Sequence, residues 1–533
     1  MVLVLALPLL SLLALLIYTL TRYIHDPKLL RRFPSPSLAR FTPLWSMYHS
    51  WTGRQTSIIY AAHKSLGPII RIAPNHISFT DPAAYRDLYG HGASLRKDDF
   101  YSHIADGNPS VSQATEKSVH AGKRRALAHV FSAREVVRLE PRVIECVEGL
   151  CAVVEGKARG VDVRSEDVNG RGDEYPVQVA DGSFDMRPWL NMFAYDAISA
   201  MLFTSGYNFL SNGNDLCPSM DEQGNVTSVH AMESFHSASL FNTVLAQLPL
   251  PLYKAGRRAF FFMRGNKAGS DFAGMARAMV QARLKNRPAE PDLFSFFPIE
   301  PSEKRPEGMP VEEVIAECAT MLDAGNDTTQ ATLTGAIYHL AKNPEKQMKL
   351  YRALVAAMPE EYKERPFIVL PTTILKEIPY LRAVLEENWR CRPPVARGLP
   401  RRATGEGANI AGHFIPAGVT VSAPIFAIHR DESLFRNPEE FMPERWLATD
   451  ESTEADRKEL QNLKNFCIPF SLGPRACIGR NLAYMEVSIV VAALVLNFEW
   501  ELAEPGSVME TIERFNCGPK VLFVKAKPRS VQM

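Results

Sequence analysis

One cysteine stands in an unusual local setting. Residues 470–479 are FSLGPRACIG, which places Cys477 between Gly473 and Gly479, directly before an apolar run. A lone cysteine is most often a buried structural thiol. Here the glycines let the backbone approach a bulky group, and the predicted helix start supplies free amides and a dipole that favour a thiolate. The pattern therefore predicts a soft metal ligand, and specifically the axial ligand of a haem iron.

A nucleophilic role is the alternative for Cys477. A cysteine nucleophile needs a histidine base placed by the fold, and no local signature of such a pair is present. The eight cysteines are scattered and include no C-x-x-C pair. This spacing argues against a cysteine-rich zinc site and against a secreted disulfide framework, and it indicates a reducing compartment.

An acid and an alcohol lie side by side in a second segment. AGNDTT, residues 324–329, contains Asp327 and Thr328 inside a long, mostly apolar stretch with a helical pattern. Burial of both polar groups is costly unless they have a partner or a task. The alternative is a kinked helix in which the threonine bonds back to a carbonyl. Both interpretations stay open at this point.

Charged residues recur at helical spacing in two further segments. In EENWR, Glu387 and Arg390 share a helix face, and the downstream PERW contributes Arg445. A surface ion pair of little energetic value is the simpler interpretation of the first pair. In HAGKRRALAHVFS, His120 and Arg124 lie one helical turn apart. A solvated basic helix face is the alternative there.

The complete pattern F-x-x-G-x-R-x-C-x-G resembles the haem-binding loop of the cytochrome P450 superfamily. The other three segments follow in that family's order, and the resemblance covers about residues 60–525. The amino-acid sequences of several segments are most similar to those of microsomal members from filamentous fungi. The resemblance implies haem b as the cofactor. The loop residues that would surround it are Cys477 as the proximal iron ligand, Arg475 at a propionate, Phe470 near the sulfur, and Gly473 and Gly479.

The resemblance also implies roles for the acid–alcohol segment. In the family, the matching part of the long central helix crosses the distal face of the haem. There the small residues Ala324 and Gly325 would leave room for dioxygen. Asp327 and Thr328 would deliver protons during its activation.

The remaining charged residues acquire roles in the same way. Glu387, Arg390 and Arg445 would form a buried network that supports the loop beneath the haem. The haem propionates would be bound by Arg124, by His120, which stands where many relatives have tryptophan, and by Arg401.

The elements that position these residues are mostly helices. Helical patterns dominate from about residue 110 to 400, while residues 68–81 are typical of a hairpin and strands return at 412–424 and 519–525. Two polar stretches, 156–183 and 211–228, are predicted to be surface loops or insertions. The expected fold class is mainly α with a small β portion, a cytochrome P450 fold in a single catalytic domain.

The N-terminus is strongly apolar. Its first 20 residues carry no charge, which is long enough for a helix to cross the hydrocarbon of a bilayer. Positive charges follow only afterwards, so the rest of the chain is expected on the cytosolic side. An interfacial helix is the alternative. The sequence thus predicts a transmembrane anchor over residues 1–21, a Pro-containing linker over 22–50 and the catalytic domain over 51–533, held as a single-pass protein of the endoplasmic reticulum membrane.

These features predict a membrane-bound haem-thiolate monooxygenase. The 60 Lys and Arg against 59 Asp and Glu leave a net charge of +1, which gives no reason to expect nucleic acid as a partner. No dinucleotide-binding motif is present and no length is left for a flavin domain. Electrons are therefore expected from a separate NADPH–cytochrome P450 reductase, with cytochrome b5 as a further candidate partner.

The substrate is expected to be lipophilic. By family position it would be bound by residues 97–115, 232–262, the helix before Ala324, 394–399 and 513–518, which are rich in apolar side chains. A polyketide- or terpenoid-like intermediate of fungal secondary metabolism is favoured over a benzoate-type aromatic acid. A haem-thiolate isomerase or dehydratase would typically lack the acid–alcohol pair. A non-catalytic haem binder would need neither that pair nor the anchor.

Overall fold

The computed structural model describes residues 17, 20, 21, 23–105, 107–160, 182–260, 263–301 and 307–529. The predicted anchor over residues 1–21 lies almost wholly outside the described residues. The same holds for most of the predicted loop over 156–183.

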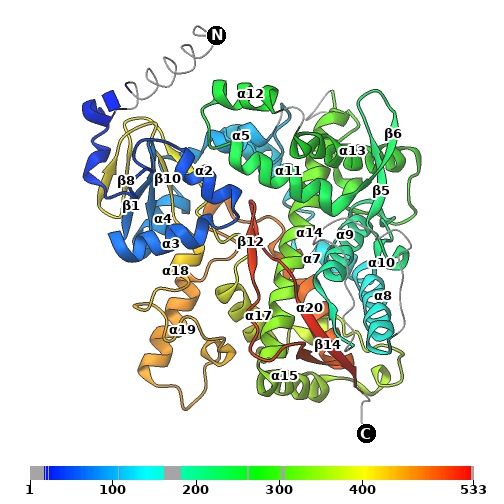
Figure 1. Ribbon diagram of the computed structural model, residues 1–533. Helices are drawn as coiled ribbons and strands as arrows, with labels where there is room; N and C mark the ends of the chain where they lie inside the picture. The colour runs from blue at the N-terminus through cyan, green and yellow to red at the C-terminus, as the bar shows by residue number, and fades with distance from the viewer. Residues whose placement is uncertain are drawn as a thin grey trace.

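Helices make up most of the described chain and surround the long central helix α14 (Figure 1). The longer helices are α2 (Leu44–Trp51), α3 (Gln55–Leu66), α4 (Pro82–Tyr89), α6 (Lys117–Leu127), α8 (Glu140–Ala158), α9 (Arg187–Phe203), α11 (Ala231–Leu245), α12 (Leu250–Ala259), α13 (Arg264–Lys285), α14 (Val311–Lys342), α15 (Pro344–Ala357), α17 (Pro379–Cys391), α19 (Glu454–Phe466) and α20 (Arg480–Asn497). The short ones are α5 (Asp99–Ile104), α7 (Ala133–Val136), α10 (Phe209–Asn212), α16 (Thr372–Leu375) and α18 (Ile425–Ile428).

The main sheet lies beside the helices and has the strand order β1-β2-β10-β7-β3. The predicted hairpin forms from β1 (Ile69–Ala73) and β2 (His76–Phe79), whose isoleucines pack into two separate hydrophobic clusters. Strand β10 (Thr420–Ser422) runs parallel to β2 and antiparallel to β7 (Arg401–Ala403). Strand β3 (Leu95–Lys97) pairs with β7 in a register that sets Lys97 opposite Arg401. The sheet therefore brings two cations from distant parts of the chain together.

Smaller sheets complete the architecture. Strands β11 (Phe498–Leu502), β14 (Phe523–Pro528) and β4 (Phe184–Asp185) form one sheet. Three hairpins form from β12 (Thr511–Glu513) with β13 (Cys517–Pro519), β8 (Ala408–Ile410) with β9 (His413–Ile415), and β5 (Leu216–Met220) with β6 (Val226–His230).

The hairpin of β5 and β6 corrects the prediction of a loop over 211–228. Every residue from Leu216 to Met220 is paired with one from Val226 to His230. Strand β6 is largely exposed, so its sequence lacks the apolar alternation by which strands are recognised. Strand β5 alternates instead between buried and less buried residues, and it packs against α13.

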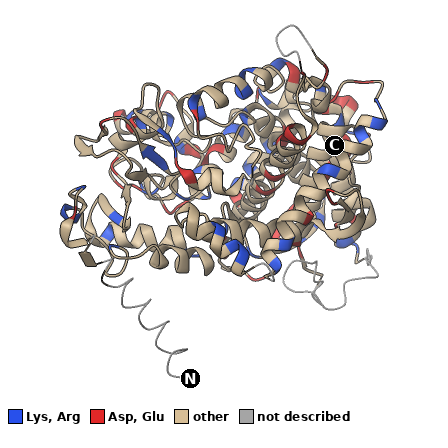
Figure 2. Ribbon diagram, turned by 90° about the horizontal axis from the view of Figure 1, so that it is seen from above, with Lys and Arg blue, Asp and Glu red and all other residues tan. Residues whose placement is uncertain are grey.

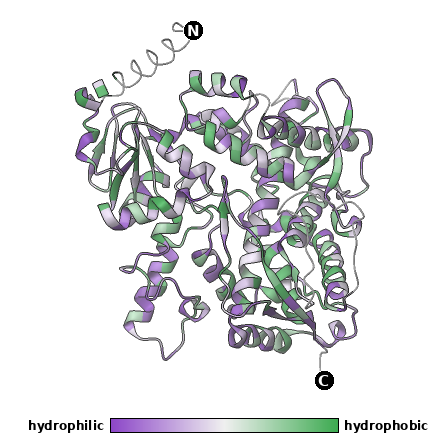
Figure 3. Ribbon diagram, in the orientation of Figure 1, coloured by the Kyte–Doolittle hydropathy of each residue, from purple (hydrophilic) through white to green (hydrophobic). Residues whose placement is uncertain are grey.

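The core is built on α14, which packs against α9 and α13 and also contacts α17 and α20. Among the described residues, α20 is the one helix long and apolar enough to cross a membrane, but most of it is buried inside the fold. Its hydropathy is among the highest of the drawn elements (Figure 3). Lys, Arg, Asp and Glu are scattered over the molecule with both signs interspersed (Figure 2).

Part of the predicted linker over 22–50 is folded. Leu30 and Phe33 are buried against the strands of the main sheet, and α2 packs on α3 and α11. The proline-containing segment therefore follows the surface of the catalytic body instead of spanning open solvent.

Candidate active site

The loop that carries Cys477 is closed by its own backbone. The amide of Cys477 donates to the carbonyl of Phe470 at 2.9 Å. Gly473 adopts a φ of 65°, and a Cβ at this position would collide with the carbonyl oxygen of Tyr89. Only glycine meets both requirements without strain, so Gly473 lets the loop lie against the end of α4.

The thiol of Cys477 lies at the start of α20, where Gly479 is the N-cap residue. The side chain is accessible to solvent. Burial of the surrounding site nevertheless raises the pKa of the thiol, and it outweighs the amide of Gly479 and the charges of Arg124 and Arg480, which lower it. The amide at the helix start therefore acts in the predicted direction, but desolvation has the larger effect on the pKa of the thiol. A coordinated metal cation reverses that balance.

Phe470 ties the loop to the helical core. Its ring lies 5.0 Å from that of Trp389 on α17 and 5.3 Å from that of Tyr484 on α20, measured between centroids. These edge-on and tilted contacts hold the loop against two helices at once.

A cluster of cations lies beside the loop. Repulsion adds to burial and lowers the pKa of Lys97 well below its usual value, that of Arg475 to about 10 and that of His120 to about 4. Arg401 contributes to all three shifts. The cation cluster consists of Lys97, Arg124, Arg401 and Arg475 together with His120, whose lowered pKa makes it a neutral hydrogen-bonding group near neutral pH.

The cation cluster is held by carbonyl groups. Arg124 donates to the carbonyl of Ala476 at 2.7 Å, Arg475 to that of Ala114 at 2.6 Å, and Arg401 to that of Pro400 at 3.1 Å. Within the described ranges, no carboxylate lies within ion-pair distance of any of the five side chains. The fold therefore concentrates positive charge here without balancing it.

The acid–alcohol pair lies in the middle of α14. The Oδ2 atom of Asp327 accepts a hydrogen bond from Asn516 at 2.8 Å, and Oδ1 lies 3.5 Å from Nε2 of His236. These partners and the charge of Arg514 outweigh burial and hold the pKa of Asp327 below its ordinary value. Asp327 is therefore a carboxylate near neutral pH.

Thr328 bonds back within the helix. Its Oγ1 donates to the carbonyl of Ala324 at 2.7 Å, which is the bond expected from the helix-kink alternative. The helix nevertheless continues unbroken from Val311 to Lys342. The hydroxyl oxygen keeps lone pairs that can accept a further hydrogen bond.

Gly325 has a packing role that the sequence did not indicate. A Cβ at this position would lie 2.7 Å from Cγ1 of Ile198 on α9. The small size of Gly325 therefore allows α9 and α14 to pack closely, and the space beside it is filled by Ile198. Ala324 is the exposed member of the pair.

Glu387, Arg390 and Arg445 meet in one buried network. Glu387 Oε1 lies 2.8 Å from Nη2 of Arg390 and 3.1 Å from Nε of Arg445. Both carboxylate oxygens are fully engaged, because the indole of Trp446 donates to Oε2 at 2.8 Å and the amide of Met442 to Oε1 at 2.9 Å.

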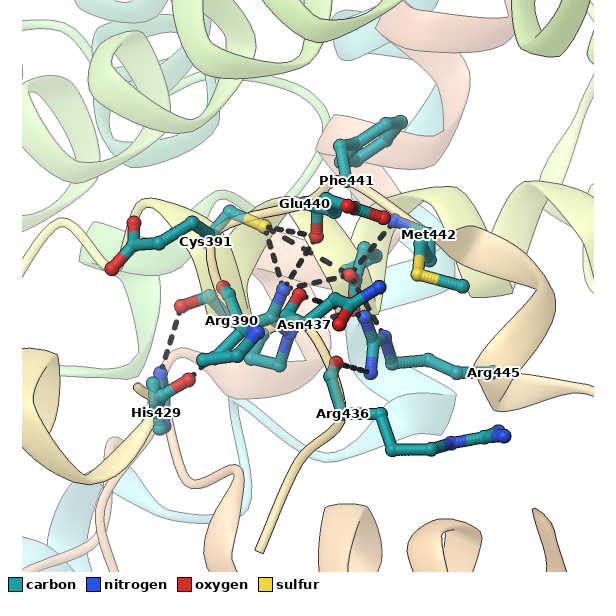
Figure 4. Close-up of polar contacts among 12 residues, drawn as sticks. Arg390, Cys391, His429, Arg436, Asn437, Glu440, Phe441, Met442 and Arg445 are labelled. Carbon is teal, nitrogen blue, oxygen red and sulfur yellow. Dashed lines mark hydrogen bonds and ion pairs between the residues drawn. The ribbon is translucent and has the colours of Figure 1, made fainter. Parts of the chain in front are cut away.

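The two arginines of this network are saturated as well. Figure 4 shows Arg390 among His429, Glu440 and Cys391, with Arg445 beside Arg436 and Asn437. Arg390 donates to the carbonyls of Pro438 at 2.7 Å and of His429 and Glu440, both at 2.9 Å. The network therefore fixes the chain between α18 and α19 onto the end of α17.

The chain as a whole matches a known protein family. The family model described as "Cytochrome P450" matches residues 36–531. The chain belongs to the cytochrome P450 family. The predicted family and the mainly helical fold are thereby confirmed, and the chain is a monooxygenase of this family.

Individual P450 relatives agree along the whole chain. It is 31% identical over 530 residues to the benzoate 4-monooxygenase bphA of Aspergillus niger, covering 98% of this chain and 97% of the relative. It is 27% identical over 490 residues to the cytochrome P450 monooxygenase poxM of Penicillium oxalicum, covering 91% and 87%. The crystal structure of a cytochrome P450 (CYP102L1) superimposes with a TM-score of 0.70 at 18% identity, covering 93% of this chain and 99% of that one.

The residues of this P450 fit the haem-thiolate iron that the family carries. A haem brings two carboxylates, and the cation cluster supplies positive charge that the described part of the protein does not neutralise. A soft iron–sulfur bond needs an accessible thiol with a hydrogen-bond donor beside it, and Cys477 meets both conditions.

Sequence reasoning missed several residues of this P450 site. Lys97 enters the cation cluster only through the register of β3 and β7, which no local pattern reveals. His236 and Asn516 reach Asp327 from distant segments. Asp323, one turn before Asp327, was identifiable as a second acid in the apolar helix. Burial and the charge of Asp327 raise the pKa of Asp323 to about 8.

Replacement of Gly325 by alanine is expected to destabilise this P450 by about 1–3 kcal/mol, because the added methyl group forces α9 and α14 apart. The measurement is the thermal unfolding midpoint of the haem-loaded protein. Gly269→Ala on α13 is the matched control, since its Cβ would lie 3.9 Å from Ala238, an ordinary contact. Equal midpoints for both variants would contradict the packing role.

Proposed function

We propose that this P450 hydroxylates or otherwise oxidises a lipophilic small molecule, with dioxygen and with electrons from a separate NADPH–cytochrome P450 reductase. The observation that carries the proposal is the joint placement of an accessible Cys477 at the start of α20 and the unneutralised cation cluster. Cytochrome b5 is a further candidate electron donor.

Cys477 would bind the iron of haem b, and the cation cluster would bind its propionates. When bound, the haem supplies the activation of dioxygen. Arg124 and Arg475 each already donate to a backbone carbonyl near the loop, so their guanidinium groups are oriented before the cofactor binds. The amide of Gly479 stabilises negative charge on the sulfur. Phe470 keeps the loop packed on the core.

Asp327 and Thr328 would supply protons at the opposite side of the site. Asp327 is ionised and can accept a proton. Its carboxylate is positioned by the hydrogen bond from Asn516 and by the nearby His236. Thr328 carries its proton on Oγ1 and can exchange its bond to Ala324 for one to a ligand. Neither residue needs to leave the helix for this task.

Thr328→Ala is expected to uncouple electron use from product formation. Loss of the hydroxyl removes a positioned proton donor, so product formation falls about 10²-fold while NADPH oxidation continues and hydrogen peroxide accumulates. The measurement is the ratio of product and of peroxide to NADPH consumed. Thr328→Ser restores the hydroxyl and is expected to restore most of the coupling. Unchanged coupling in the alanine variant would exclude Thr328 as the donor.

Membrane attachment is part of the proposal. Exposed apolar side chains lie on α2 and α12, among them Tyr48 at 63% and Leu252 at 56% exposure. They support a surface that dips into a bilayer beside an anchor over residues 1–21. The catalytic domain would lie on the cytosolic face of the endoplasmic reticulum.

The class of substrate has two candidates. The resemblance to fungal P450s favours a polyketide- or terpenoid-like secondary metabolite. The similarity to a benzoate 4-monooxygenase supports an aromatic acid as the second candidate.

Oxygen-isotope incorporation tests the proposed reaction. Microsomes containing the protein and a fungal reductase are supplied with NADPH, ¹⁸O₂ and mixtures of lipophilic metabolites and aromatic acids. A product that carries one ¹⁸O atom, absent without NADPH, is expected. Conversion without ¹⁸O would indicate a haem-thiolate isomerase or dehydratase instead.

A further inference from the structure

Arg397 is a partly buried cation without a carboxylate partner in the described part of the chain. Its Nε and Nη1 atoms are buried and lack a hydrogen-bond partner. No carboxylate in the described part of the chain lies within ion-pair distance of it. The acid whose charge it senses, Glu513, already accepts a hydrogen bond from the amide of Thr56 at 2.6 Å. An unpaired buried guanidinium is costly, so its retention calls for a function.

Two aromatic rings hold the guanidinium of Arg397 in place. Its central carbon lies 5.3 Å from the ring centroid of Phe100 and 5.9 Å from that of Phe515. The two rings are nearly parallel, with an interplanar angle of 22° and centroids 6.2 Å apart. Cation–π contacts fix the orientation of a guanidinium without using its N–H groups. Arg397 is therefore a preorganised donor.

A second unpartnered donor lies close to Arg397. Tyr101 is buried and its hydroxyl has no hydrogen-bond partner of good geometry. Burial raises the pKa of its phenol, and the charge of Arg401, a side-chain interaction with Arg401 and the charge of Arg397 partly offset that effect. The neutral phenol of Tyr101 and the guanidinium of Arg397 can therefore donate O–H and N–H hydrogen bonds to the same ligand group.

Arg397 lies where segments predicted to bind substrate converge. Phe100 and Tyr101 come from the 97–115 segment, and they cluster with Ala246 of the 232–262 segment and with Phe515 of the 513–518 turn. That turn is tied to the 394–399 loop by the bond from the Cys517 amide to the Pro394 carbonyl, at 2.7 Å.

The same turn reaches the middle of α14. The side chain of Asn516 donates to Asp327, which lies beside Thr328. The 513–518 turn thus links the rings around Arg397 to the central helix.

Arg397 lies next to the cation cluster but outside it. The pKa values of Lys97, His120 and Arg475 are lowered by charges within the cluster and not by Arg397. Arg397 acts on His76 and on Tyr101, whose ring also contacts Lys97 and whose phenol is also acted on by Arg401. The cation cluster already provides enough positive charge for two propionates, which leaves Arg397 for a different anion.

We propose that Arg397, with the hydroxyl of Tyr101, binds a carboxylate of the substrate. The substrate is therefore an apolar organic acid, recognised by a charge-assisted and bidentate pair. This inference rests on the proposed function and deepens it, because it selects the acid class among lipophilic substrates. The apolar side chains of the same segments accommodate the remainder of the molecule.

Paired probes test this inference by direct binding. The affinities of benzoate, methyl benzoate, decanoate and methyl decanoate are measured by equilibrium dialysis against the haem-loaded full-length protein at neutral pH. At least one acid is expected to bind about 10- to 100-fold more tightly than its own ester. Arg397→Gln is expected to remove that preference and to leave the affinity for the ester within about twofold. Arg397→Lys keeps the charge but not the planar guanidinium that binds a carboxylate with two hydrogen bonds, and it should retain part of the preference for the acid.

Arg392→Gln is the matched control. Arg392 lies five positions earlier, and its guanidinium also lies against an aromatic ring, that of Tyr338, at 4.9 Å. Its removal is expected to leave the acid preference unchanged. Should Arg397→Gln fail to retain haem, Tyr101→Phe replaces it, with a loss of about 3- to 10-fold in affinity for the acid alone.

The outcomes separate this inference from the proposed function. Equal affinity for acids and esters in the unaltered protein, or a preference that survives Arg397→Gln, overturns the carboxylate site. Loss of haem retention in Arg397→Gln with an intact acid preference in Tyr101→Phe assigns Arg397 to the cofactor and also overturns it. Dialysis does not depend on turnover, so a failed ¹⁸O experiment leaves the binding result interpretable.

Discussion

Cys477→Ala is expected to abolish both the thiolate signature of the haem and monooxygenase turnover. The sulfur at the start of α20 is the group positioned to bind the iron, and the methyl group of alanine cannot coordinate it. The reduced, carbon-monoxide-bound spectrum measures this directly. The unaltered protein should show the band diagnostic of thiolate-ligated haem, and the variant should lack it while product formation falls to the level without enzyme.

Cys467→Ala controls for the loss of a nearby thiol. Cys467 lies ten positions earlier at the end of α19, and burial raises its pKa well above the usual value, so it is a neutral structural thiol. The control should keep the thiolate band. Survival of that band in Cys477→Ala, or its loss in Cys467→Ala, would show that the ligand has been assigned to the wrong cysteine.

Glu387→Gln is expected to cost about 3–5 kcal/mol of stability and to leave little haem-loaded protein. The substitution removes the carboxylate that faces both Arg390 and Arg445. It leaves the buried guanidinium of Arg390 without a carboxylate partner, while Arg445 keeps its ion pair with Glu459. Glu387 is fully buried, so solvent cannot replace the lost partner. Soluble holoprotein yield and the denaturant midpoint measure the effect.

The neighbouring residue provides the control for this prediction. Glu386 is paired with Arg382, whose side chain is 56% exposed, and it accepts a hydrogen bond from Tyr484. Glu386→Gln keeps the same shape and removes the same charge at a partly buried position whose arginine partner is solvated, and should cost less than about 1 kcal/mol. Comparable losses in the two variants would contradict the buried network.

The sequence by itself predicts the chemistry at Cys477. The glycines, the arginine and the following apolar helix occur within ten residues, so local pattern suffices to predict a metal-ligating loop. The hairpin at β1 and β2 was likewise predictable, because its strands and turn are adjacent in the chain. The family comparison then confirmed the fold and the class of enzyme that these local signals predicted.

Only the tertiary structure decided what surrounds those residues. Gly325 faces Ile198, and Lys97 lies opposite Arg401, because helix packing and strand register join segments that no local spacing relates. The polar loop expected over 211–228 is a hairpin, since pairing and contact with α13 replace the apolar alternation that one strand lacks. At Cys477, desolvation by the surrounding fold raises the pKa of the thiol, against the opposite effect of the helix start that the sequence reveals. The surroundings of Arg397 are likewise decided by the tertiary structure. The sequence shows that the residue is positively charged, but only the packing of α5, the 394–399 loop and the 513–518 turn shows that its buried N–H groups have no partner.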